Sequence, residues 1–69
     1  MWKKCRKLPV IIEVREVKHN EFGIETLEGY KECNLADHFI LKGIRGEEYP
    51  IRQDIFNETY EVLDESITE

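Results

Sequence analysis

The stretch Phe39-Ile-Leu-Lys-Gly-Ile-Arg-Gly-Glu-Glu-Tyr-Pro-Ile51 predicts two short strands joined by a glycine turn. Its side chains alternate between two faces, with Phe39 and Leu41 together on one of them. Gly46, in the bend, stands where a residue with positive φ closes a three-residue loop with a bulge. Pro50 cannot donate to a ladder, so the second strand should lie at a sheet edge or end there. We expect the rest of the chain to be arranged around this hairpin.

Leu8–Val17 predicts the first strand of the fold, because branched and apolar residues alternate with charged ones along it. Val10, Ile12 and Val14 share one face, and we expect that face to meet the core. Pro9 sits at the start of the segment, one of the few positions in a strand that tolerates proline.

A second hairpin is predicted from Phe22–Thr26 and Tyr30–Cys33, with Gly29 free to take a positive φ in the turn between them. The connector that follows contains Asn34 and Asp37, either of which can accept backbone hydrogen bonds as an Asx turn. Both features are local turn chemistry, which connects strands without adding a further element.

The C-terminal part permits two interpretations. Asp54 is a suitable N-cap for one helical turn, after which Tyr60–Leu63 predicts a closing strand. The alternative is a single helix over Asp54–Leu63, since Phe56, Tyr60 and Leu63 have helical spacing. We favour the turn and strand. The fold class is then mostly β: a small antiparallel barrel or folded sheet of five to six short strands, with one short helical turn near the C-terminus.

The 69 residues suffice for a single domain with a small core. We expect a basic arm at 1–7, a β-rich core at 8–63 and a frayed tail at 64–69. A chain this short buries only about 60% of the surface that its unfolded form exposes. Self-association is therefore the simplest additional source of stability, and we expect a homo-oligomer or a protein partner.

Charge is unevenly distributed. The net charge is −5, but the arm carries +4, so the remaining residues carry −9 (−5 minus +4). The arm's charges are the candidate phosphate contacts: Lys3, Lys4, Arg6 and Lys7. An acidic body is a poor surface for nucleic acid, because phosphate binding needs Lys and Arg to release counterions. The ordinary interpretation of the arm is a solvated terminus that keeps the first strand from pairing with other chains.

No secretory or membrane segment is predicted, because charges interrupt Pro9–Val17 and no long apolar run follows. We expect a cytoplasmic protein with no membrane contact. Cys5 and Cys33 could form one disulfide, but without a signal peptide reduced thiols are the better expectation.

The chain contains Arg6-Lys7-Leu8-Pro9-Val10-Ile11-Ile12-Glu13, Thr26-Leu27-Glu28-Gly29, the run Ile40-Leu-Lys-Gly-Ile-Arg-Gly-Glu-Glu-Tyr-Pro50, Asp54-Ile-Phe56 and Thr59-Tyr-Glu61. On these residues it resembles a family of small uncharacterised proteins found largely in bacteriophages and prophages. Members commonly have Gly-Asp at the position of Asp37-His38, Cys at Ile51, Pro at Gln53, and an insertion after the first strand. The resemblance implies a recurring scaffold and no particular reaction.

Residues that could carry chemistry do not form a recognised constellation. The candidate metal ligands, Cys5, His19, Cys33 and His38, lack the paired spacing of a structural zinc site, so we predict no metal and no cofactor. Cys33 and His38 could approach each other, but Glu32 and Asp37 give the thiol an acidic neighbourhood that disfavours a thiolate. We therefore predict no catalytic residues, no small-molecule substrate and no enzyme.

The leading hypothesis is a non-enzymatic accessory module that binds protein and self-associates. The candidate interaction surface is Lys42, Arg45, Glu47 and Tyr49. One alternative is a nucleic-acid-binding small β-barrel that uses the basic arm, with a stacking platform drawn from six aromatic residues: Phe22, Tyr30, Phe39, Tyr49, Phe56 and Tyr60. A metal-binding domain is the third hypothesis.

Overall fold

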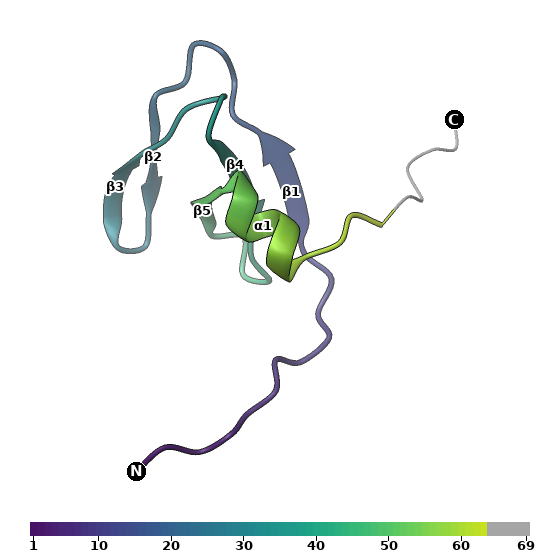
Figure 1. Ribbon diagram of the computed structural model, residues 1–69. Helices are drawn as coiled ribbons and strands as arrows, with labels where there is room; N and C mark the ends of the chain where they lie inside the picture. Colours follow the sequence, from purple (N-terminus) through teal and green to yellow (C-terminus); the bar gives the residue numbers. More distant parts are fainter. Residues whose placement is uncertain (64–69) are drawn as a thin grey trace.

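The computed structural model describes residues 1–63; the tail predicted at 64–69 lies outside them. The elements are β1 (Glu13–Glu16), β2 (Gly23–Thr26), β3 (Gly29–Glu32), β4 (His38–Lys42), β5 (Glu48–Arg52) and α1 (Gln53–Thr59). They form a three-stranded sheet in the order β1-β4-β5 and a two-stranded sheet β2-β3, all antiparallel (Figure 1). The mostly β prediction is confirmed, in the form of a small folded sheet that does not close into a barrel.

The β4–β5 hairpin forms as the sequence predicts, with Leu41 opposite Tyr49. At its end the Gly43 N–H donates to the Glu47 carbonyl oxygen (2.8 Å) and the Gly46 N–H donates to the Gly43 carbonyl oxygen (3.0 Å). Gly46 has φ 84°, a conformation that L side chains rarely adopt, which confirms its assigned role. The loop lies one residue earlier than expected, at residues 44–46.

Pro50 lies on an edge strand of the three-stranded sheet, as predicted. Bonds to β4 flank it at both ends of β5: Gly43 donates to Glu47, and Gln53 donates to Asp37 (2.9 Å). Hydrogen-bonded positions alternate along an antiparallel ladder, so Pro50 falls at a position whose nitrogen faces away from β4. Its missing N–H therefore removes no bond from the ladder.

β4 is the central strand, and two consecutive residues on it are buried on opposite faces of the sheet. Ile40 is 2% exposed and packs with Val17 and Cys33, with Ile24 of β2 against them. Leu41 is 1% exposed and shares the other face with Phe39, whose ring meets Phe56 of α1 edge-on at 5.1 Å. The core is thus divided between the β2–β3 side and the α1 side of one strand.

The first strand is shorter than predicted. Of Leu8–Val17, only β1 pairs with β4, because Glu13 is opposite Lys42 and the chain turns at Gly43 immediately afterwards. Residues before Glu13 therefore have no strand opposite them. The expected core face is only partly covered, since Val14 lies opposite the buried Leu41 but is itself 38% exposed, whereas Val17, on the opposite face, is 1% exposed.

The predicted short helical turn near the C-terminus is confirmed by α1, whereas the Asp54 N-cap, the closing strand and the longer helix are wrong. Arg52 occupies the N-cap position without a side-chain cap, and Asp54 lies in the first turn of α1. The helix ends at Thr59, and Tyr60 is extended (φ −132°, ψ 159°), so a helix does not reach Leu63 and no strand forms over residues 60–63. The Tyr60 ring instead stacks on the Phe56 ring, with 5.1 Å between the ring centres. The spacing of four residues therefore brings the two rings together although the helix has already ended.

Truncating Ile40 tests whether β4 carries the fold. Ile40→Ala should lower the free energy of unfolding by about 2–5 kcal/mol, because it leaves a cavity in the core. Ile44→Ala is the matched control, since Ile44 is 71% exposed at the hairpin tip. Urea unfolding followed by circular dichroism measures both; equal losses for the two variants would contradict the assigned core.

Candidate interaction surface

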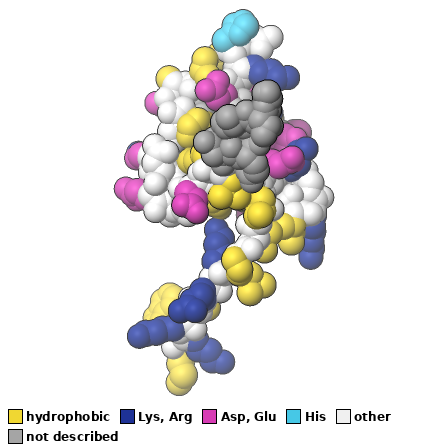
Figure 2. Space-filling view, turned by 90° about the vertical axis from the view of Figure 1, so that its right-hand side faces the viewer, with side chains coloured by type: hydrophobic (Ala, Val, Ile, Leu, Met, Phe, Trp, Pro, Cys, Tyr) yellow, Lys and Arg dark blue, Asp and Glu magenta, His cyan; other side chains and the backbone are white. Residues whose placement is uncertain are grey.

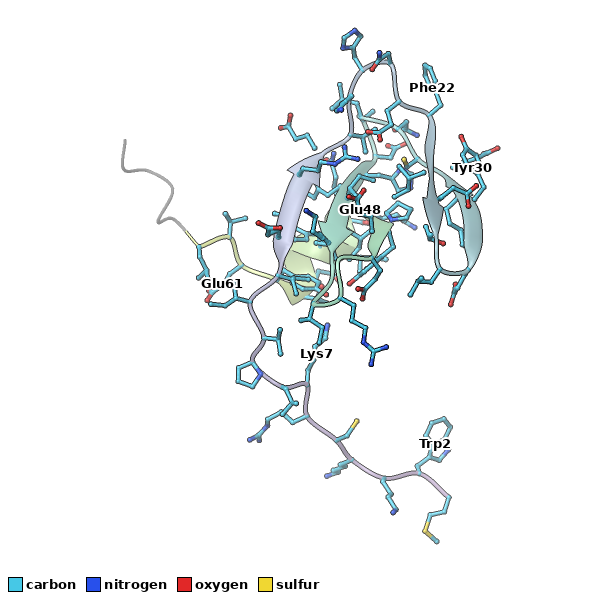
Figure 3. The ribbon with its side chains drawn as sticks, turned by 180° about the vertical axis from the view of Figure 1, so that it is seen from behind. Trp2, Lys7, Phe22, Tyr30, Glu48 and Glu61 are labelled. Atoms are coloured by element: carbon cyan, nitrogen blue, oxygen red, sulfur yellow. The ribbon has the colours of Figure 1, made fainter. Side chains whose placement is uncertain are left out.

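The N-terminal segment, residues 1–12, runs away from the folded body with no strand paired to it (Figure 1). Trp2 lies at its far end, remote from the sheet (Figure 3). Hydrophobic and basic side chains mix along the segment, and further hydrophobic side chains gather where it leaves the body (Figure 2). The exposed apolar residues of the segment are Met1, Trp2, Leu8, Val10 and Ile11. A surface of this kind is typical of a site that another molecule covers.

One contact ties the segment to the body. The Lys7 Nζ donates to the Tyr60 hydroxyl (3.1 Å) and lies 4.8 Å from the centre of the Tyr60 ring. The hydrogen bond with Tyr60 raises the pKa of Lys7. Of the four candidate phosphate contacts, Lys7 is thus engaged, whereas Lys3, Lys4 and Arg6 make no ion pair within residues 1–63.

The charged side chains of β1 are bound mainly within their own molecule. Arg15 donates to both carboxylate oxygens of Glu21 (Nη1–Oε1 2.8 Å, Nη2–Oε2 3.0 Å) and lies 3.7 Å from Glu48. Glu21 also accepts the Lys18 N–H (3.1 Å). These bonds, with the Arg15 bond first, lower the pKa of Glu21 from 4.5 to about 2. On the same face, Glu13 lies 3.6 Å from the Nζ of Lys42.

The four residues predicted as an interaction surface do not share one face of the sheet. Lys42 and Tyr49 lie on opposite faces of the sheet, because Lys42 pairs with Glu48 and Tyr49 with Leu41 in adjacent rows. Tyr49 is half-buried, and this burial is the main cause of its raised pKa. The remaining two belong to the turn, where the Arg45 N–H donates to Glu47 Oε1 (3.0 Å).

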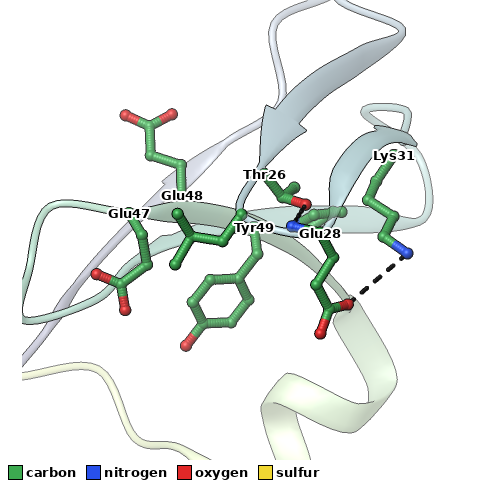
Figure 4. Close-up of a pocket in the computed structure, with 8 residues that line it drawn as sticks. Thr26, Glu28, Lys31, Glu47, Glu48 and Tyr49 are labelled. Carbon is green, nitrogen blue, oxygen red and sulfur yellow. Dashed lines mark hydrogen bonds and ion pairs between the residues drawn. The ribbon is translucent and has the colours of Figure 1, made fainter.

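A cavity of about 380 Å³ lies between the β2–β3 turn and β5 (Figure 4). Its lining residues are Thr26, Leu27, Glu28, Lys31, Glu47, Glu48, Tyr49 and Pro50. Glu28 lies 3.9 Å from Lys31, and its N–H donates to the Thr26 hydroxyl oxygen (3.0 Å). These polar groups hold the hairpin turn together, and the lining offers no nucleophile next to a base.

A second cavity, of about 500 Å³, brings Cys33 and His38 together with Phe22 and Tyr30. The Nδ1 of His38 accepts the Asn34 N–H (3.2 Å), so that nitrogen is not available to take a thiol proton. Burial is the main cause that raises the pKa of Cys33, which keeps the thiol protonated. The predicted Asx turn is present here, since the Asp37 N–H donates to Asn34 Oδ1 (2.8 Å).

The candidate metal ligands are dispersed. Cys5 is exposed on the N-terminal segment and Cys33 is buried, and both are free thiols. No group of three or more His, Cys, Asp and Glu side chains that could hold a metal occurs among residues 1–63. No helix in this described part of the chain has the length and apolar character needed to cross a membrane.

The aromatic side chains do not share one platform. Phe39, Phe56 and Tyr60 form a packed series on the α1 side, whereas Phe22 and Tyr30 are exposed on the β2–β3 side. Comparison with models of known families, with curated proteins and with solved structures finds no match for this chain. The resemblance to phage-type proteins therefore stays a prediction.

Sequence reasoning missed the free edge of β1. A signal was available, because the alternating pattern from Leu8 to Val17 is longer than the four residues of β4 that pair with β1. The Lys7–Tyr60 contact joins residues 53 positions apart, so a local sequence pattern does not predict it.

The ion pair that holds β1 should respond to acid. Because the pKa of Glu21 is lower in the folded chain, its stabilisation is complete above pH 4.5 and is lost as the pH falls towards about 2. Urea unfolding of the wild type and of Glu21→Gln across this range isolates the contribution. The wild type should be the more stable above pH 4.5, with the difference vanishing near pH 2. A difference that stays constant with pH would contradict the assignment.

Proposed function

We propose that this chain is a non-enzymatic module that binds protein and self-associates through its N-terminal segment and β1. The supporting observation is that apolar side chains continue the line of β1 beyond its intramolecular partner and remain exposed, Val10 at 49% and Ile11 at 76%. Water-exposed apolar side chains next to a strand edge favour pairing with another chain.

A second copy of the chain is the partner that the charge distribution favours. The +4 carried by residues 1–7 opposes the −9 of the remainder, so the segment of one copy is attracted to the body of another. Two-fold association also uses the same exposed residues twice, which doubles the apolar area removed from water. We place the module in the cytoplasm, where its two free thiols, Cys5 and Cys33, would stay reduced.

Binding of single-stranded nucleic acid is the second candidate. It is favoured by the exposure of Trp2 beside Lys3, Lys4 and Arg6, since an aromatic ring among basic residues can stack on a base. The acidic body opposes it. The two candidates differ in which residues they require: basic side chains for nucleic acid, apolar ones for self-association.

Light scattering tests self-association. At tens of micromolar concentration the wild type should show twice the monomer mass of 8.3 kDa. Val10→Lys should shift the protein towards monomer, because it places a charge in the exposed apolar row. Leu27→Lys is the matched control, since Leu27 is exposed on the β2–β3 turn, away from β1. A wild type that is monomeric and fully folded by circular dichroism would refute the proposal.

A mobility-shift assay at low salt tests the second candidate with a single-stranded oligonucleotide. If the chain binds through its basic segment, Lys3, Lys4 and Arg6 changed together to Glu should abolish the shift. The self-association proposal expects no shift for the wild type at physiological salt. A shift that survives the triple change would eliminate the basic segment as the binding element.

A further inference from the structure

We propose that two copies join edge to edge along β1, in an antiparallel ladder centred on Ile12. Val10 of one copy then lies opposite the partner's Val14, and the two three-stranded sheets become one continuous sheet. This inference rests on the proposed self-association and names the surface and the register through which it occurs.

The direction of the backbone groups follows from the ladders within one copy. Gly43 donates to Glu47 towards β5, and bonding alternates along β4, so Leu41 also bonds to β5. Ile40 and Lys42 consequently bond to β1, at Arg15 and Glu13. The intervening residues of β1 turn their N–H and C=O groups outward.

Val14 thus presents its backbone groups at the free edge of β1, where no other strand lies within residues 1–63. The outward C=O of Glu16 accepts a hydrogen bond from the Arg15 Nη1 (3.1 Å), so the edge open to a partner strand begins at Val14. In the proposed dimer the chain continues as a strand through Ile12 and Val10, so the same alternation applies to them. The strand of a partner must therefore form its backbone hydrogen bonds through its own even-numbered residues. A two-fold ladder of this kind can have its symmetry axis at residue 11, 12, 13 or 14.

Two of these registers are disfavoured. A ladder centred on Glu13 places that carboxylate directly opposite the partner's Glu13, and like charges in this position are destabilising. A ladder centred on Val14 places Glu13 opposite the partner's Arg15. Arg15 is already bound to Glu21 and Glu48 in its own copy, so this pairing would add little to the association.

The chain near Pro9 excludes the third register. The Val10 N–H donates to the Leu8 carbonyl oxygen (2.8 Å), which bends the chain at Pro9. A ladder centred on Ile11 would stop at this bend, leaving the partner's Val14 uncovered. Centring on Ile12 instead ends the ladder at Val10, whose C=O remains free to accept the N–H of the partner's Val14.

The Ile12 register also completes an apolar row. Val14 lies opposite Leu41, and Leu41 opposite Tyr49, so the three share the sheet face that α1 covers. Val10 of the partner subunit would extend this row by one residue, and symmetry repeats the extension in the other copy. In addition, antiparallel pairing places the basic arm of each copy next to the partner's Glu16. Glu16 is the one charged residue of β1 without an ion pair in the described part of the chain.

Disulfide cross-linking distinguishes the registers. The parent is Cys5→Ser, because Cys5 is exposed whereas Cys33 is buried. Directly opposite residues in a bonded pair have Cα atoms about 5.5 Å apart, which a disulfide spans. Ile12→Cys should therefore form a covalent dimer under mild oxidation. Val10→Cys mixed with Val14→Cys should cross-link, while each alone should not.

Leu27→Cys measures collisional cross-linking, since Leu27 is exposed on the β2–β3 turn. Ile12→Cys should react at least about tenfold faster than this control, because pairing raises the local thiol concentration, and the advantage should disappear in urea. Efficient linkage of Val14→Cys alone, or no advantage for Ile12→Cys, would overturn the register. If light scattering shows the Cys5→Ser parent to be a dimer in either case, self-association stands; if the parent is a monomer, the proposed function fails as well.

Discussion

The structure depends on β4 being buried from both sides. Ile40 and Leu41 are consecutive, so their side chains point to opposite faces of the sheet, and both are almost completely removed from water. Within residues 1–63 two units cover β4, the β2–β3 hairpin and α1. Each is placed on its own face, with Ile24 and Cys33 on one and Phe56 on the other. The turns and the edge strands place these two units against the two faces of β4.

Local turn chemistry was predictable because it is decided by one or two residues. Gly29 and Gly46 have positive φ, Asn34 accepts a backbone hydrogen bond, and Pro50 lies on an edge strand, each as its residue type requires. The mostly β class follows from the same signals together with the alternating pattern. These features need no knowledge of what packs against the strand.

Predictions that depended on distant neighbours were wrong. The alternating pattern of Leu8–Val17 indicates two faces but not which face will be covered, and Val17 lies on the face that the β2–β3 side protects. The length of β1 is set by its partner, since β4 turns away at Gly43. Likewise, Tyr60 has helical spacing from Phe56 but is extended in the structure. The relative placement of the candidate surface residues also depends on the register, because Lys42 and Tyr49 are close in sequence yet lie on opposite faces of the sheet.

An alternating pattern that extends beyond the strand paired with it in the same molecule indicates that this segment can pair with another chain. Val10 and Ile12 fit a sheet, yet a single copy gives them no strand to pair with. Pro9 and the basic residues before it limit how far a neighbouring chain can pair, as edge-blocking residues do in other sheets. On the opposite side, β5 carries Pro50 and is contacted by β2 and β3, which leaves it a poor acceptor for another strand. Pairing through β1 with two-fold symmetry would occupy the free β1 edges of both copies. The assembly would therefore close as a dimer and would not extend into a fibre.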